Sequence, residues 1–183
     1  MGVGRATHAE IHKGSDAGAR HPKLPGAACS QTLNPDFLDL LAALVRADAR
    51  FLVVGAHAMA AHGVPRATGD LDVWIQPDED NAGRVWEALI AFGAPVQTLG
   101  LSKADLVAPA MVFQMGEPPR RIDVLTSITG IEFEEAWAAR SIHRVGKIDV
   151  PFLGRAALLT NKRATGRTKD LADVEILERP ERQ

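Results

Sequence analysis

The sequence predicts one α/β (α+β) domain in which helices cover a mixed β-sheet. Short apolar runs rich in Val, Ile and Leu alternate along the chain with longer segments in which apolar residues recur at helical spacing. Glycine, proline or an acidic residue separates most of these segments. At 183 residues, of which 46% are hydrophobic, the chain is large enough for one core. We therefore expect a single domain over residues 33–179, preceded over residues 1–32 by a flexible extension rich in small and basic residues.

Cap residues and glycines place the elements in the first half of the domain. Asn34 followed by Pro35 is typical of a helix start, and Gly93 is typical of a helix end. Asp80 is expected to cap the helix that ends there, and Gly55 is expected to end a short apolar strand. The elements expected in order are helix 35–45, strand 51–54, helix 56–62, strand 70–75 and helix 80–92.

The second half is expected to add strands, a hairpin and the C-terminal helices. Pro109 interrupts residues 107–115, but the MVFQM segment favours a strand. Gly146 and Lys147 lie where a hairpin turn is expected, and Thr168 is expected to cap the last helix. The elements expected in order are strands 111–115 and 121–126, helix 132–140, hairpin 141–152, helix 155–164 and a last helix with Leu171, Val174 and Leu177 facing inward.

Composition excludes several classes of protein. Lys and Arg number 21 against 23 Asp and Glu, a formal net charge of −2, so no global positive field favours nucleic-acid binding. Cys29 is the only cysteine, which excludes an internal disulfide framework and a thiolate zinc site. No apolar run approaches the roughly 18 residues of a membrane span, and the N-terminus lacks the apolar segment of a secretion signal. We expect a cytoplasmic protein with no membrane partner.

Three aspartates interrupt otherwise apolar strands. Side chains alternate along a strand, so Asp70 and Asp72 point to the same face, with Cα atoms roughly 6.6–7 Å apart. Asp123 lies in the same setting, between apolar neighbours. If the two strands pair side by side, three carboxylates converge on one surface, and oxygen donors of this kind suit Mg²⁺ or Mn²⁺. The alternative is that the aspartates cap turns or form ion pairs with nearby arginines, namely Arg66, Arg120 and Arg121.

Backbone groups and basic side chains near these strands are candidate phosphate contacts. Gly55 and Ala56 lie between an apolar strand and a helix, whose first N–H groups can bind an anion. A tight turn without a ligand explains the same pattern equally well. Lys162 and Arg167 flank the expected break at Gly166, where cations can reach a phosphate.

Two further side chains are expected close to the acidic strand. Arg66 precedes it by four residues and either contacts phosphate or neutralises Asp70 at rest. Trp74 shares the face of Asp70 and Asp72, so it is the tryptophan expected nearest to a ligand. His57 and His62 do not share a helix face, and a histidine metal site is not expected there.

Several motifs together resemble a known family. Gly55-Ala56, thirteen residues, and then Asp70-Leu71-Asp72-Val73 resembles the signature of the DNA polymerase β-like nucleotidyltransferase superfamily. More closely, four segments between about residues 35 and 178 resemble minimal bacterial nucleotidyltransferase-like proteins related to AbiEii-type toxins. These segments are VVGAHAMAAHG, PRATGDLDVWI, RIDVLTSITGIEFEEAW and NKRATGRTKDLADVEIL. The resemblance implies the nucleotidyltransferase fold, with a helix-covered mixed sheet and C-terminal helices.

The resemblance also implies roles for single residues. Asp70 and Asp72 match the metal-binding carboxylates, and Asp123 matches the third carboxylate, which binds metal or activates the attacking hydroxyl. Gly55 matches the glycine of the phosphate-binding turn. Ala56 departs from the usual Gly or Ser, which removes a serine hydroxyl contact to the triphosphate and leaves its backbone amide.

A C-terminal motif extends the resemblance. Lys162, Arg167, Asp170 and Asp173 match a motif of the AbiEii-like relatives in which the lysine faces the nucleotide. The implied activity is a nucleotidyltransferase dependent on Mg²⁺ or Mn²⁺. It would move an NMP from an NTP to a hydroxyl acceptor, a tRNA or a protein, and release pyrophosphate.

Two other functions compete with this one. The first is a catalytically weak or inactive binding or regulatory subunit of nucleotidyltransferase fold, with a partner protein from a two-gene system such as a toxin–antitoxin pair. The alanine at position 56 supports it. The second is a metal phosphohydrolase that uses the same carboxylates, which leaves the Gly55 turn and the basic C-terminal motif without a role.

Overall fold

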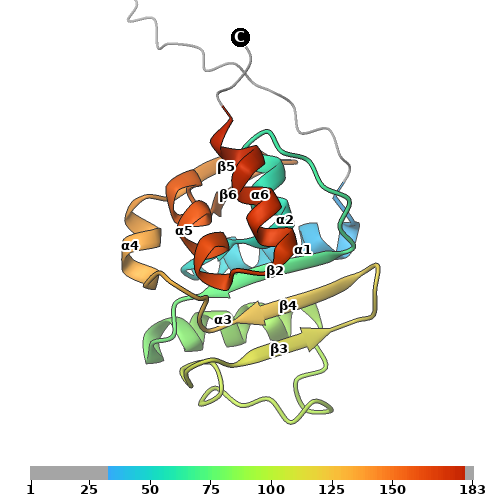
Figure 1. Ribbon diagram of the computed structural model, residues 1–183. Helices are drawn as coiled ribbons and strands as arrows, with labels where there is room; N and C mark the ends of the chain where they lie inside the picture. Colours follow the sequence, from blue (N-terminus) through green and yellow to red (C-terminus); the bar gives the residue numbers. More distant parts are fainter. Residues whose placement is uncertain (1–32, 180–183) are drawn as a thin grey trace, which may run out of the picture.

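The computed structural model describes residues 33–179, so the expected extension over residues 1–32 lies outside the described part of the chain. Elements appear there in the order expected from the sequence (Figure 1). The helices are α1 Pro35–Arg46, α2 Gly55–Ala61, α3 Glu79–Phe92, α4 Phe133–Ala138, α5 Arg155–Thr165 and α6 Thr168–Glu178. The strands are β1 Phe51–Val53, β2 Asp70–Ile75, β3 Val112–Met115, β4 Arg121–Leu125, β5 Ser141–Val145 and β6 Ile148–Phe152.

The strands of residues 33–179 form one six-stranded sheet in the order β3-β4-β2-β1-β6-β5. β1 pairs with β2, β3 with β4 and β5 with β6 in antiparallel orientation, whereas β2 with β4 and β1 with β6 run parallel. The parallel pairs require crossover connections, and α3, β3 and their loops form the connection between β2 and β4. The expected mixed sheet covered by helices is therefore confirmed.

The two faces of β2 differ in character. Leu71, Val73 and Ile75 on one face are completely buried in the main core. α1 and α3 pack against each other and lie behind the sheet in Figure 1, while α5 and α6 lie in front of it. Asp70 and Asp72 alternate with the core residues and therefore point to the face on which the C-terminal helices lie.

Two helix caps differ from the expectation. Asp78 rather than Asp80 caps α3, because Asp78 has an extended backbone and its carboxylate accepts the N–H of Asn81 at 2.7 Å. Thr168 is the first helical residue of α6, and the cap residue is Arg167. Of the residues expected to face inward in α6, Val174 and Leu177 are buried and Leu171 is 48% exposed.

Membrane insertion through a helix has no candidate in the described residues. Among residues 33–179, no helix combines the length and the apolar character needed to cross a bilayer.

Candidate functional site

The pairing of β2 with β4 brings the three aspartates onto one face of the sheet. These strands are parallel neighbours in which Asp72 lies opposite Asp123 and Asp70 lies opposite Arg121. Gln114 of β3 lies opposite Asp123 on its other side. Directly opposed residues of neighbouring strands share a face, so the register alone determines which side chains meet.

Arg121 bridges two of the three carboxylates. Its Nη2 donates to Asp70 Oδ2 at 2.8 Å and to Asp123 Oδ2 at 3.0 Å, and its Nε donates to Asp123 Oδ1 at 2.7 Å. Gln114 Nε2 donates to the same Asp123 Oδ2 at 3.2 Å. Hydrogen bonding to Asp123 raises the pKa of Arg121, which keeps the guanidinium charged. The ion-pair alternative considered for the aspartates is thus realised by Arg121.

The donor set suits a hard divalent cation, although its present arrangement does not form a metal cage. Among residues 33–179, no group of three His, Cys, Asp or Glu side chains could hold a metal ion as it stands. Asp70 Oδ1 is nevertheless buried without a hydrogen-bond partner. A buried carboxylate oxygen without a donor is costly, and a cation at this position would satisfy it.

Asp72 makes no ion pair with Arg121. Burial, together with the charges of Asp123 and Asp70, raises the pKa of Asp72 to about 6 against the opposing charges of Arg121 and Lys162. A carboxylate that is buried beside two others attracts protons or metal ions more strongly than an isolated one.

The lack of a side chain at Gly55 leaves room for the Asp72 carboxylate beside the start of α2. This glycine has a φ of 63°, and a Cβ added there would lie 2.1 Å from Asp72 Oδ2. α2 begins at Gly55 itself, one residue earlier than expected, and its preceding residue Val54 offers no side-chain cap. Gly55 therefore lies directly against the Asp72 carboxylate.

Replacing Gly55 by alanine tests this close approach. We expect Gly55→Ala to destabilise the protein by about 2 kcal/mol or more, because the left-handed backbone costs roughly 1–2 kcal/mol and the Asp72 carboxylate must also move. Urea unfolding measures the loss. Gly63→Ala is the matched control, since Gly63 has a φ of 81° and open space around its Cα. Equal losses in the two variants would contradict the proposed contact.

The basic residues form a second cluster around two buried aspartates. Lys162 Nζ contacts Asp170 Oδ1 at 2.7 Å and Asp173 Oδ2 at 2.9 Å, and Arg167 Nε contacts Asp170 Oδ2 at 2.7 Å. Arg66 pairs with Asp173. Both carboxylates are 1% exposed. Since Arg66 pairs with Asp173, the expectation that it neutralises Asp70 is wrong. The motif resemblance had singled out Asp170 and Asp173, but their burial depends on how α6 packs on α5.

Electrostatics holds this cluster together and connects it to the sheet carboxylates. Burial tends to raise the pKa of Asp170, but hydrogen bonds and charges from Lys162 and Arg167 outweigh it and leave that pKa below its usual value. The charge of Lys162 also lowers the pKa of Asp72. Because its charge acts on Asp72, the Lys162 cation, whose side chain is 12% exposed, lies near the acidic face of β2.

Trp74 does not occupy the position expected of it near a ligand. Its residue exposure is 2%, and its ring packs edge to face against Phe133 of α4 with centroids 5.0 Å apart. Its Nε1 is buried without a hydrogen-bond partner. α4 covers the sheet face beyond Asp72, which removes this indole from contact with a base.

A hollow of about 490 Å³ lies near the first residues of β2 and β4. Its lining includes Thr68, two residues before Asp70, and Arg120, one residue before Arg121. His57 of α2 also lines it, and burial lowers the pKa of this histidine, which favours a neutral ring. The three aspartates of β2 and β4 are not among the residues that line it, so this hollow is separate from the carboxylates.

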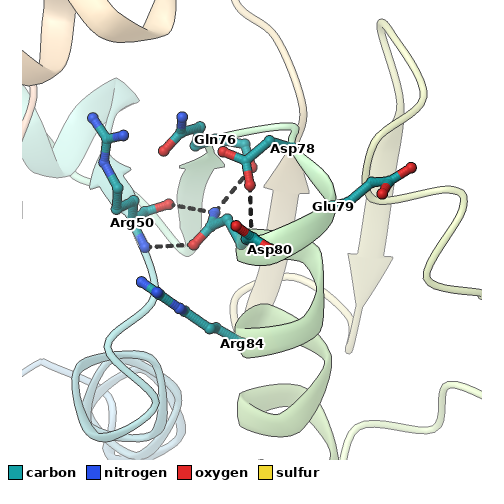
Figure 2. A pocket seen from close by; sticks show the side chains of 7 residues that line it. Arg50, Gln76, Asp78, Glu79, Asp80 and Arg84 are labelled. Atoms are coloured by element: carbon teal, nitrogen blue, oxygen red, sulfur yellow. Dashed lines mark hydrogen bonds between the residues drawn. The ribbon is translucent and has the colours of Figure 1, made fainter.

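A second hollow, of about 380 Å³, lies at the other end of β2 and has a structural explanation (Figure 2). Asn81 is buried and accepts the N–H of Arg50 at 2.7 Å, while its amide donates to the carbonyls of Arg50 and Gln76 at 2.9 Å each. Asp78 caps the same helix turn. These bonds join the ends of β1 and β2 to α3.

No protein-family model matches the chain, and no curated protein matches its sequence.

Proposed function

We propose that the protein is a metal-dependent nucleotidyltransferase that moves an NMP from an NTP to a hydroxyl group of an RNA or protein acceptor. The observation that carries this proposal is the juxtaposition of three carboxylates on β2 and β4 with the Lys162 cluster of α5 and α6. Oxygen donors beside fixed cations are what a metal–triphosphate complex requires.

Asp70 and Asp72 would hold Mg²⁺ or Mn²⁺, and Asp123 would complete the set. The ion, when bound, supplies charge neutralisation at the phosphates and draws the attacking hydroxyl toward its deprotonated form. Gly55 and Ala56 would offer backbone N–H groups to the triphosphate. Lys162 would face the phosphates, with Arg66 and Arg167 at the rim of the same cluster.

The reaction balances without any further reactant. The acceptor oxygen forms a bond to the α-phosphorus, the bond from that phosphorus to the bridging oxygen breaks, and pyrophosphate leaves. The proton of the hydroxyl passes to a carboxylate, for which Asp123 is the candidate. Asp170 and Asp173 take no part in bond formation but position the lysine and the arginines that face the phosphates.

The decisive experiment measures both binding and transfer. Titration calorimetry with ATP, CTP, GTP and UTP in the presence of Mg²⁺ should give metal-dependent binding, and α-labelled NTP should label an RNA or protein acceptor. Asp70→Asn and Asp72→Asn should each lower the transfer rate by about 10²-fold or more while folding stays intact. Asp39→Asn, an exposed aspartate of α1, is the matched control. Unchanged transfer in both site variants would rule out the mechanism.

A second candidate function keeps the fold without turnover. Ala56 in the phosphate turn and the guanidinium already seated between Asp70 and Asp123 favour a binding or regulatory subunit, with a partner protein from a two-gene system such as a toxin–antitoxin pair. Absence of any NTP binding in the same titrations, together with a stable complex with a neighbouring gene product, would favour this function.

A further inference from the structure

Arg121 holds a cation at the point where two of the candidate metal ligands meet. Three hydrogen bonds of 2.7 to 3.0 Å join its guanidinium to Asp70 and Asp123. We propose that Arg121 is an internal counter-ion that competes with the divalent cation for these two carboxylates, so that metal enters by displacing the guanidinium. This inference rests on the proposed metal site.

The use of the carboxylate oxygens makes simultaneous binding unfavourable. Arg121 engages both oxygens of Asp123, and Gln114 adds a second donor to one of them. Asp70 retains Oδ1, which is buried without a partner. A metal ion that takes Asp70 and Asp123 together must therefore remove at least one arginine hydrogen bond, and two cations on the same oxygens repel each other.

The charges favour exchange when metal is abundant. The face carries Asp70, Asp72 and Asp123 against the Arg121 guanidinium and the charge of Lys162. Asp72 receives no hydrogen bond from the guanidinium. A divalent ion neutralises more of this negative charge than a single guanidinium does. At low metal concentration the guanidinium offsets the mutual repulsion of the carboxylates and occupies Asp70 and Asp123 in place of the metal ion.

The side chain of Arg121 has a route out of the site. It is 29% exposed, and within residues 33–179 its side-chain hydrogen bonds go to Asp70 and Asp123. Rotation about its side-chain bonds would carry the guanidinium into solvent without breaking contacts of the core. Gln114 would remain on Asp123 to orient that carboxylate toward an incoming ion.

Mn²⁺ alone is the probe, and its binding to the full chain is measured by electron paramagnetic resonance of the free ion. Arg121→Gln removes the competing charge and should tighten Mn²⁺ binding by about tenfold, since a bidentate charge-assisted contact no longer has to be broken. Arg120→Gln, one residue earlier and exposed, removes the same charge and should leave binding within about twofold.

A second variant covers the loss of stability that Arg121→Gln could bring. Arg121→Lys keeps the charge but cannot make the two-pronged contact, so Mn²⁺ binding should tighten by about threefold in a folded protein. In thermal unfolding, Mn²⁺ should raise the midpoint of Arg121→Gln more than that of the wild type.

The outcomes separate this inference from the proposed function. Equal or weaker Mn²⁺ binding in the Arg121 variants, with clear binding by the wild type, overturns the competition and leaves the metal site intact. No Mn²⁺ binding by the wild type or by any Arg121 variant overturns the competition and the metal site together.

Discussion

Replacing Lys162 by methionine is expected to destabilise the protein by about 3 kcal/mol, the largest stability loss among the site variants considered. Lys162 contacts Asp170 at 2.7 Å and Asp173 at 2.9 Å, and both carboxylates are 1% exposed. Removing one partner of a buried ion pair leaves desolvated charge behind, and the remaining partners, Arg66 and Arg167, are more exposed than the lysine. Denaturant unfolding at pH 7.5 measures the change.

Lys169→Met is the matched control for this substitution. Lys169 lies on the exposed side of α6, next to Asp170, and its loss should change stability by less than about 0.5 kcal/mol. The charge-retaining variant Lys162→Arg should recover part of the loss. A destabilisation below about 1 kcal/mol in Lys162→Met would show that the cluster does not carry the packing of α6 on α5.

The second large effect has the opposite sign, because Asp72→Asn should stabilise the metal-free protein at neutral pH. Burial, with the charges of Asp123 and Asp70, raises the pKa of Asp72 to about 6 in the folded protein, whereas an unfolded aspartate titrates near 3.9. The folded state therefore binds more protons between these values, and the wild type loses stability as the pH rises from about 4 to about 6. We expect a gain of about 1–3 kcal/mol for Asp72→Asn above pH 6.

The pH profile distinguishes this effect from ordinary changes in surface charge. The stability difference between Asp72→Asn and the wild type should shrink as the pH falls from about 6 and vanish only well below the unfolded pKa near 3.9, where the wild-type carboxyl is protonated in both states. Asp39→Asn in α1 controls for the removal of one exposed carboxylate. A difference that does not vary between pH 4 and pH 7 would contradict the proposed charge repulsion at Asp72.

The stability that Asp170 contributes depends on pH in the opposite direction from that of Asp72, so their pH dependence distinguishes the two clusters. Its pKa lies below the usual value because cations outweigh the effect of burial. The stability that it contributes is present above the unfolded pKa near 3.9 and is lost as the pH falls through the lower folded value. Unfolding below pH 4 therefore reports on the Lys162 cluster, and the range from pH 4 to pH 6 reports on Asp72.

Local signals in the sequence were sufficient for most of the fold. Strand β2 runs from Asp70 to Ile75 as expected, because polar and apolar residues alternate over its first four positions and Trp74 and Ile75 continue it with high strand propensity. The hairpin of β5 and β6 and the glycine end of α3 follow from turn and cap chemistry. The cap positions of α3 and α6 differ from the expected residues, since several adjacent polar residues can serve as caps.

The sequence indicated which residues share the face of the candidate site, but it did not indicate which of their side chains contact one another. The alternation rule placed Asp70 and Asp72 on one face, and the matching apolar setting indicated Asp123. Trp74 was assigned correctly to that face, but nothing local indicated that Phe133 of α4 would cover it. One of the two interpretations of Arg66 placed it beside Asp70, but its side chain instead reaches Asp173 in α6.

The order of the elements and the residues of the candidate site follow from local patterns in the sequence. Both depend on short-range periodicity, caps and turns, which act over a few residues. Tertiary structure alone decided that Arg121 bridges Asp70 and Asp123 and that Lys162 binds two buried aspartates. Those pairings depend on the parallel register of β2 with β4 and on the packing of α6 against α5. Residues far apart in sequence become partners only when the sheet and the helices are assembled.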